Sequence, residues 1–537
     1  MTQTIIPTSA QILVVGGGPA GSYAAAALAR EGFNVVVLEA AAFPRYHIGE
    51  SLLPSVRHFL KFIDAERLVV AHGFTPKPGA AVKLNQHKRE GYTDFVALSP
   101  DHGAWNVIRS EFDDLLLTYA ATCGARVIQR TRVTDIHFDE HNSNRPIAAS
   151  WKNDAGREGF IHFDYLVDAS GRNGIMSTKY LRNRCFNKGL QNVACWGYWE
   201  GTGCYMPNTN RENAIWIEAL EDESGWAWFI PLHDNSTSVG IVMDQKISMS
   251  KKSAAREKAG VTGHSLEDHY LAELQRTPGV IKLLANGKLR RKGESDAVKT
   301  AGDFSYAATS YAGDHYRIAG DAGAFIDPFF SSGVHLALTG GLSAAVTIAA
   351  SIRKTASEDL AQTWHSSKVG TSYTRFLLVV LGTYKQIRSQ SFPVMSDIDE
   401  DNFDRAFSLI RPVIQGTADV GKVVTEDELQ TGIFQKTMDF CRHIFAPTDP
   451  AMHASVASRL DPNLVSPACP VITEDQINQL VAEDDEEAKL VLCEINARKP
   501  IHAMYTPTQH FQLESHFGHA AVLKRGHLGL YAVPSDS

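Results

Sequence analysis

The residues near the N-terminus with the clearest chemical meaning are glycines whose spacing suits the binding of a dinucleotide. Gly16, Gly18 and Gly21 satisfy the pattern G-x-G-x-x-G. The first glycine allows a tight turn, the second lets a pyrophosphate approach the backbone, and the third lets a helix pack closely on a strand. Glu39 ends the next apolar run, where a carboxylate can accept hydrogen bonds from both ribose hydroxyls. A purely structural glycine turn is the alternative, and the position of Glu39 argues against it.

The elements that must position these residues are a strand, a helix and a second strand. Residues 12–15 form a short apolar run, the alanine-rich segment 19–30 has helical character, and residues 35–38 are apolar again. This order predicts the start of a parallel βαβ unit, with the phosphates at the N-terminus of the helix. Residues 190–243 are rich in Trp, Tyr and Gly and predict antiparallel strands, whereas the chain beyond about residue 355 has a helical character.

Charge and cysteine content exclude several classes of protein. The formal net charge of −8 argues against nucleic-acid binding, which usually leaves a basic footprint. The seven cysteines occur singly and never as C-x-x-C, which favours reduced thiols over a disulfide scaffold, and we expect no metal site. The N-terminus lacks the features of a secretory signal. Residues 334–352 carry no Lys, Arg, Asp or Glu, but they contain many small and polar residues. We therefore expect a buried helix rather than a membrane span, in a cytoplasmic protein.

Two later segments resemble fingerprints of the p-hydroxybenzoate hydroxylase class of flavoproteins. They read Val-Asp-Ala-Ser-Gly-Arg at 167–172 and Arg-Ile-Ala-Gly-Asp-Ala-Gly at 317–323. The resemblance implies FAD as the cofactor, with Asp321 on its ribityl chain, although an ordinary helix N-cap is an alternative for Asp321. It also implies cofactor contacts for four further residues, Arg45, Glu50, Arg109 and Val334. No second glycine fingerprint is available for NAD(P)H, so we expect reduced FAD to come from a separate NAD(P)H-dependent flavin reductase.

Within that class the chain resembles the flavin-dependent halogenases, specifically the fungal group that chlorinates phenolic polyketides. The stretches that carry this resemblance are 44–51, 89–95, 327–335 and 411–416, together with the motif W-x-W-x-I-P at 226–231. The resemblance implies that the four motif residues Trp226, Trp228, Ile230 and Pro231 keep the substrate away from the flavin and so discourage direct hydroxylation. Taken alone, tryptophans two residues apart also fit one buried face of a strand.

Lys77 is the second halogenase hallmark, in the setting Gly-Phe-Thr-Pro-Lys-Pro-Gly at 73–79. The prolines on both sides disfavour helix and predict an extended, stiff backbone. The family resemblance implies that Lys77 is the catalytic residue and directs hypochlorous acid to the substrate. Its ammonium can polarise hypochlorous acid by a hydrogen bond, or its free amine can form a chloramine. The sequence leaves both routes open, and without the resemblance a lone lysine would be read as a surface group.

The loop before residue 334 bears on the halide and on the substrate. The amides near Ser332 and Gly333 are expected to hold chloride or bromide, because a glycine turn at a helix start favours anions. Tryptophan halogenases carry a catalytic glutamate in this loop, and Phe330 occupies its position here. A phenol already directs chlorine to its ortho position, so we expect an electron-rich phenolic small molecule as the substrate, with O2 as a further co-substrate.

The expected fold is α/β, with a Rossmann-type FAD-binding fold, an inserted antiparallel-sheet substrate region and a C-terminal helical region. The expected boundaries are 1–125, 155–180 and 300–352 for a discontinuous FAD-binding domain, 80–105 and 181–299 for the substrate-facing sheet, and 353–537 for a helical region covering the substrate pocket. Two rival functions remain open: a flavin-dependent aromatic hydroxylase and a non-catalytic flavin-binding protein.

Overall fold

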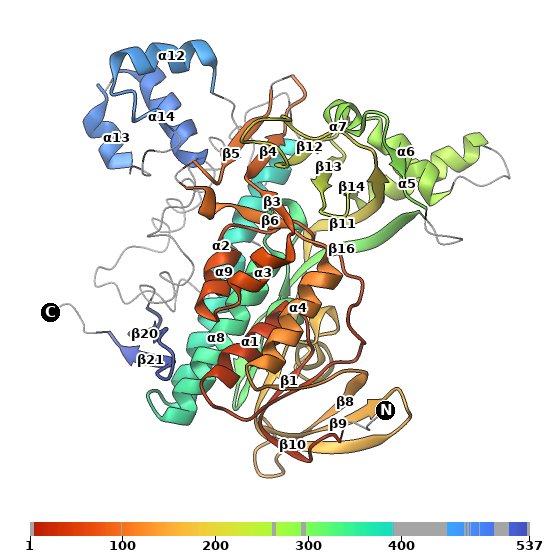
Figure 1. Ribbon diagram of the computed structural model, residues 1–537, viewed down its shortest axis with the longest axis vertical. Helices are drawn as coiled ribbons and strands as arrows, with labels where there is room; N and C mark the ends of the chain where they lie inside the picture. Colours follow the sequence, from red (N-terminus) through yellow and green to blue (C-terminus); the bar gives the residue numbers. More distant parts are fainter. Residues whose placement is uncertain are drawn as a thin grey trace.

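The computed structural model (Figure 1) describes residues 5–388 apart from 88, 98, 260–264 and 292–296, and then 390, 448–466, 469, 472, 474–482, 484–498 and 515–533. The stretch 411–416, which contributed to the halogenase resemblance, lies outside these residues. Two large sheets organise the described part of the chain.

The first sheet has a parallel core in the order β18-β10-β1-β2-β7. Its strands are β1 (Ser9–Val15), β2 (Val35–Leu38), β7 (Arg126–Ile128), β10 (Glu158–Asp168) and β18 (Tyr316–Ile318), extended by the antiparallel β8 (Thr131–Phe138), β9 (Pro146–Asn153) and β17 (Ala312–Gly313). The helices α1 (Pro19–Arg30), α4 (Arg109–Thr122) and α8 (Gly333–Arg353) lie side by side and bury their apolar side chains in one core with β1 and β2. The predicted βαβ unit and α/β fold class are confirmed.

Helix α1 shows why the glycine motif folds as it does. Gly18 is the N-cap in an extended conformation, and Pro19, which needs no hydrogen-bonded amide, is the first helical residue. The alanines that follow are buried against α8 and α4, where small side chains let the helices approach closely. As a result the first turn of α1 begins directly at the C-terminal end of β1.

The second sheet follows the order β19-β16-β11-β14-β13-β12-β4-β5, with β15 pairing with β11. Its strands are β4 (Gly79–Lys83), β5 (Gly91–Asp94), β11 (Arg184–Glu200), β12 (Ile215–Ala219), β13 (Gly225–Pro231), β14 (Ser236–Asp244), β15 (Lys288–Leu289), β16 (Val298–Ala308) and β19 (Ala324–Phe325). The central strands are antiparallel, as the Trp- and Tyr-rich segment predicted. The boundary expected at residue 300 falls inside β16, because β16 pairs with β11 along much of its length.

Shorter elements surround the two sheets. They are α2 (Ser55–Phe62), α3 (Glu66–His72), β3 (Thr75–Lys77), β6 (Ala104–Asn106), α5 (Gln245–Ala259), α6 (Leu266–Leu274) and α7 (Pro278–Leu284). After α8 come α9 (Glu358–Ile387), α12 (Pro450–Arg459), α13 (Glu474–Leu480), α14 (Glu486–Arg498) and a hairpin of β20 (His519–Val522) and β21 (Gly529–Ala532). The hairpin packs against α8, so the described part of residues 353–537 is not purely helical.

Helix α8 has the length and composition of a membrane span, but 83% of its most apolar window is buried inside the protein. It packs against α1, α2 and α9, and this placement agrees with the expectation of a buried helix. Its small residues Gly340 and Gly341 lie close to the backbones of Ala319 and Ala20. Helix α8 is thus a core helix of this fold.

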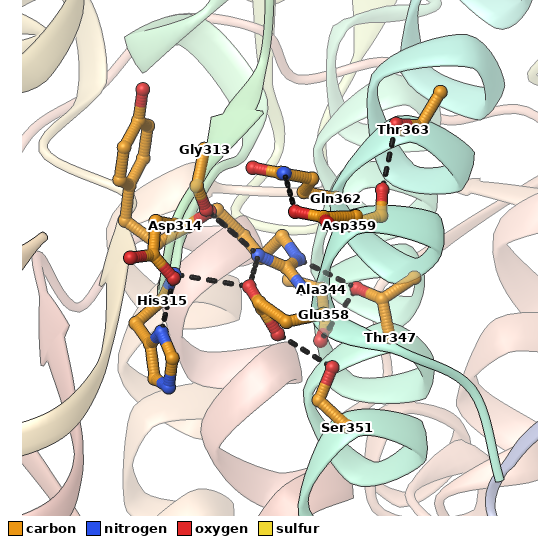
Figure 2. A network of polar contacts seen from close by, with 12 residues as sticks. Gly313, Asp314, His315, Ala344, Thr347, Ser351, Glu358, Asp359, Gln362 and Thr363 are labelled. Carbon is orange, nitrogen blue, oxygen red and sulfur yellow. Dashed lines mark hydrogen bonds and ion pairs between the residues drawn. The ribbon is translucent and has the colours of Figure 1, made fainter. Parts of the chain in front are cut away.

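A buried ion pair ties β18 to the helices behind it (Figure 2). Arg317 on β18 donates from Nε to Thr347 on α8 at 3.0 Å and from Nη1 to Glu358 on α9 at 2.8 Å. Glu358 also accepts hydrogen bonds from Ser351 and from the backbone of His315. These contacts hold the C-terminal end of β18, from which the chain continues toward Asp321.

Candidate active site

A cavity of about 490 Å³ extends between the C-terminal ends of β1 and β2 and the face of the second sheet. It gathers most of the side chains singled out in the sequence. The predicted residues that line it are Gly16, Gly18, Glu39, Arg45, Glu50, Arg109, Trp226, Trp228, Ile230, Asp321, Gly333 and Val334. Four predicted residues do not line it: Gly21, Lys77, Pro231 and Ser332.

Two glycines of the motif, Gly16 and Gly21, leave no room for a side chain. A Cβ on Gly16, whose φ is +102°, would lie 2.2 Å from the carbonyl oxygen of Ala169, and one on Gly21 would lie 2.0 Å from the carbonyl oxygen of Gly16. Glu39 accepts hydrogen bonds from the amides of Gly17 and Ala41, both at 2.6 Å, which fix its carboxylate at the cavity wall. Gly21 therefore packs helix against strand, while Gly16 and Gly18 expose backbone to the cavity.

Two arginines make one side of the cavity electropositive. Arg109 binds the buried carboxylate of Asp113 with two nitrogens, at 2.9 and 3.0 Å, and donates to the carbonyl of Ile48 at 2.8 Å. Arg45 binds the same carboxylate at 3.0 Å. Two cations thus share one anion. Asp321 lies opposite, where burial raises the pKa of its carboxyl group and Arg109 opposes that rise.

These features fit FAD. The glycine backbone at the start of α1 and the net positive arginine pair suit a pyrophosphate, and Glu39 and Asp321 can accept hydrogen bonds from sugar and ribityl hydroxyls. The cavity is long enough to run from these groups to the tryptophans of the second sheet.

The residues of the W-x-W-x-I-P motif lie on β13 and alternate between its two faces. Trp226, Trp228 and Ile230 point into the cavity side, and the residues between them face the opposite core. Trp226 donates from Nε1 to the hydroxyl of Tyr384 at 2.8 Å, and Trp228 donates to Ser238 at 3.1 Å. These hydrogen bonds hold the two indoles at fixed orientations. The tryptophans lie on one buried face of the strand, and this same face lines the cavity.

Lys77 ends β3 on the far side of the cavity wall. Its side chain is 1% exposed, and Nζ donates to Ser51 Oγ at 2.8 Å and to the carbonyl of Leu52 at 2.9 Å. Ser51 itself lines the large cavity, so it lies between the cavity and the lysine. Burial lowers the pKa of Lys77 to about 7. Near neutral pH, therefore, both the ammonium and the free amine are populated.

The pKa of Lys77 predicts a pH dependence of stability. As pH rises from about 7 toward the ordinary lysine value of 10.5, the folded protein releases this proton while the unfolded chain keeps it. The unfolded state then binds more protons, so stability rises with pH, by up to about 1.4 kcal/mol per pH unit for one proton. We expect Lys77→Met to remove this rise. Denaturant unfolding of both proteins across this pH range measures it, and parallel pH profiles would contradict the buried amine.

The loop before α8 is fixed by a buried carboxylate. Asp327 accepts hydrogen bonds from the backbone of Phe329 at 3.0 Å and from the Tyr384 hydroxyl at 2.6 Å. Ser332 is the N-cap of the 21-residue helix α8 and is fully buried, and its hydroxyl has no hydrogen-bond partner among the described residues. Gly333, the first helical residue, lines the cavity. The predicted halide residues therefore lie at a helix N-terminus next to the cavity, with one polar group unpaired.

Several residues of this site had no assigned role in the sequence. Ser51 contacts Lys77, Tyr384 joins Trp226 to Asp327, and Tyr198 donates to Glu50 at 2.6 Å. In the sequence Ser51 directly follows Glu50, a predicted cofactor-binding residue, and this position could have indicated that Ser51 belongs to the site. Tyr198 and Tyr384 carried none, because each meets its partner only through tertiary structure.

Comparison with known proteins agrees with this geometry. Residues 9–372 match the model of a family described as an FAD binding domain. The flavin-dependent halogenase armH4 of Armillaria mellea is 58% identical over 98% of this chain and 99% of its own length. The sulochrin halogenase gedL of Aspergillus terreus is 53% identical over 78% of this chain and 77% of its own length.

A solved structure shares both the fold and part of the sequence. The myxobacterial chondrochloren halogenase CndH superposes with a TM-score of 0.64 and 28% identity, covering 80% of this chain and 97% of that protein. The cavity brings together the glycine motif, the arginine pair and the paired tryptophans, in agreement with these relatives. This chain therefore belongs to the flavin-dependent halogenases, on an FAD-binding fold of the p-hydroxybenzoate hydroxylase class.

Proposed function

We propose that this chain chlorinates an electron-rich phenolic ring of a polyketide-type compound and that Lys77 directs the chlorine to the ring. The observation that carries the proposal is the buried amine of Lys77, 2.8 Å from Ser51, which lines the flavin cavity. Reduced FAD, when bound, supplies with O2 the oxidising power that converts chloride into hypochlorous acid. The protein's own residues then bind the halide, confine the oxidant and place the ring.

The halide site that we propose is the start of α8. The amides of Ser332 and Gly333 lie at the N-terminus of a long helix, next to the cavity that Gly333 lines, and the Ser332 hydroxyl, unpaired among the described residues, can donate to an anion. This arrangement binds chloride or bromide without a metal ion. Asp327 fixes the loop before α8, and the hydroxyl of Tyr384 hydrogen-bonds to both Asp327 and Trp226. The same tyrosine therefore positions the loop of the proposed halide site and the first tryptophan of the motif.

Lys77 acts in the proposed reaction as a hydrogen-bond donor to hypochlorous acid or as the amine of a chloramine. Its enclosed position excludes bulk water, which would otherwise compete for the oxidant. The ring carbon ortho to the phenol oxygen attacks chlorine, and the ring proton and the hydroxide of hypochlorous acid leave as water. Phe330 packs on Phe329 in the loop where tryptophan halogenases carry a glutamate, which favours a ring that needs no such carboxylate.

The substrate class has support from the relatives. One relative is a sulochrin halogenase, and others are named flavin-dependent halogenases of Armillaria mellea. We further propose that the reduced flavin comes from a separate NAD(P)H-dependent reductase and that the protein works in the cytoplasm.

The test is mass spectrometry of a resorcylic or anthraquinone-type phenol incubated with the protein, a flavin reductase, NADH, FAD and chloride, with free tryptophan as the comparison substrate. We expect a chlorine isotope doublet on the phenol and little product from tryptophan. A gain of oxygen instead of chlorine would assign the protein to the aromatic hydroxylases. Flavin oxidation without any product from a range of phenols would favour a non-catalytic flavin-binding protein.

A further inference from the structure

A second cavity of about 300 Å³ adjoins the flavin cavity. His47, Glu50 and Arg109 line both cavities, so these three residues form the wall between them. The second cavity also contacts Tyr46, which is 51% exposed and therefore reaches solvent. Glu50, in contrast, is only 3% exposed.

A chain of hydrogen bonds connects solvent-exposed Tyr46 to Glu50. The hydroxyl of Tyr198 donates to Glu50 Oε1 at 2.6 Å, and the hydroxyls of Tyr46 and Tyr198 are 3.1 Å apart. Trp196 Nε1 donates to the Tyr46 hydroxyl at 2.8 Å. Because an indole N–H can only donate and Tyr198 gives its proton to Glu50, the proton of Tyr46 must point toward Tyr198. Each hydroxyl in this chain therefore donates in the direction of Glu50.

The other oxygen of Glu50 is available for chemistry. Oε2 is buried and makes no hydrogen bond of normal geometry among the described residues, although the nearby Ser238 hydroxyl also favours the ionised carboxylate. A buried carboxyl oxygen without a partner is costly when ionised, which favours a proton on this oxygen. The carboxyl group can thus receive a proton at Oε1 from Tyr198 and release one from Oε2.

The reaction of a halogenase needs such a proton. FADH2, O2, chloride, the ring C–H and one proton give FAD, the C–Cl product and two molecules of water. For every chloride consumed, one proton must therefore be delivered to the flavin cavity.

We propose that Glu50 donates this proton into the flavin cavity and is reprotonated from the second cavity through Tyr198 and Tyr46. The inference rests on the proposed halogenase function. Glu50 is the proton donor, and the two tyrosines are positioning residues that relay its replacement proton.

The electrostatic surroundings are consistent with this role. Burial raises the pKa of Glu50 to about 7, although Tyr198, Ser238 and Arg109 favour its ionised form and Asp234 opposes them. Burial also raises the pKa of Tyr46 to about 12 and raises the pKa of Tyr198, so both hydroxyls keep their protons at neutral pH.

The remaining charged groups that face Glu50 do not compete for this role. Burial lowers the pKa of His47 to about 4, so at neutral pH it is a neutral imidazole and not an acid that could supply this proton. Arg290 and Lys299 also line the second cavity, where Arg290 pairs with Asp234 at 3.0 Å and Lys299 lies over the ring of Tyr46.

The first test uses infrared spectroscopy of the full chain without added flavin, so it does not depend on turnover. We expect a protonated carboxyl band that titrates near pH 7 and is absent from Glu50→Gln. Tyr198→Phe should keep the band and raise its midpoint, because the ionised form loses a hydrogen bond. Tyr270→Phe is the matched control: the buried Tyr270 accepts from Trp199 of β11 and donates to the backbone of Val239 rather than to a carboxylate. Its band should match that of the unsubstituted chain.

The second test measures release of hypochlorous acid, trapped as a chloramine of taurine, in a Lys77→Met background. This background removes the lysine that titrates in the same pH range. We expect the rate to fall above pH 7, and Glu50→Gln to lower it about 100-fold and abolish the fall. Tyr198→Phe should lower the rate toward that of Glu50→Gln, whereas Tyr270→Phe should not.

The outcomes separate the two proposals. An unchanged rate and pH profile in Glu50→Gln, in a protein that still releases hypochlorous acid, would overturn the proton path and leave the halogenase function intact. A difference spectrum between the unsubstituted chain and Glu50→Gln without a protonated carboxyl band would also overturn it, because the bands of other buried carboxyl groups with raised pKa, such as Asp321, cancel in that difference. Absence of hypochlorous acid and of chlorinated product from the unsubstituted chain would instead contradict the proposed function.

Discussion

Replacement of Lys77 by methionine should reduce chlorinated product by at least about 100-fold while FAD still binds with unchanged affinity. Methionine keeps the length and apolar contacts of the lysine side chain but removes the nitrogen that donates to Ser51 and Leu52. Loss of one preorganised donor in a water-excluded site typically costs about 100- to 1000-fold in rate. The chloramine route would lose its nucleophile altogether. Mass spectrometry of the phenol product, with flavin titration of the same protein, measures both effects.

Lys61→Met is the matched control for this substitution. Lys61 lies on α2 and is about half exposed, and among the described residues its ammonium forms a long ion pair with Glu66 at 3.8 Å. Such a pair contributes little to stability, so this variant should chlorinate at the rate of the unsubstituted chain. Retention of most of the chlorination in Lys77→Met would show that the oxidant reaches the ring without this amine.

Replacement of Gly16 by alanine should lower FAD affinity by at least about 100-fold, equivalent to about 2.7 kcal/mol. The φ of +102° already disfavours any side chain, at a cost of about 1–2 kcal/mol. The new Cβ would also lie 2.2 Å from the carbonyl oxygen of Ala169, a backbone atom that cannot rotate away. The turn must therefore shift, and the amides between β1 and α1 move with it. Flavin fluorescence titration measures the loss.

Gly32→Ala separates the effect of a side chain at a positive φ from the effect of the close contact with Ala169. Gly32 follows α1 with a φ of +87°, and in the described part of the chain no atom beyond Gly32 and its two chain neighbours lies within 4 Å of a Cβ placed there. This variant should lose about 1 kcal/mol of stability, as expected for a left-handed residue, and keep its affinity for FAD. Equal loss of FAD affinity in both variants would mean that backbone strain, rather than the contact with Ala169, disturbs the turn.

The sequence alone was sufficient for the parts of the site that are made locally. The glycine motif and Glu39 come from consecutive elements of one βαβ unit, in which parallel pairing of β1 with β2 brings the ends of both strands to the same edge. The alternation of Trp226, Trp228 and Ile230 onto one face follows from the two-residue period of a strand. The extended backbone at Lys77 likewise follows from its neighbouring prolines.

Tertiary structure alone decided the partners and the protonation of these groups. Ser51 meets Lys77 only because β6 pairs both with β3 and with the segment around Ser51. Tyr198 meets Glu50 only because β11 of the second sheet lies against that same segment. Tyr384 reaches Trp226 and Asp327 from a helix far along the chain. No local spacing encodes such contacts, because they depend on how separately folded layers pack. The low pKa of Lys77 and the high pKa of Glu50 arise for the same reason, since both are caused by burial, and burial is a property of the assembled fold.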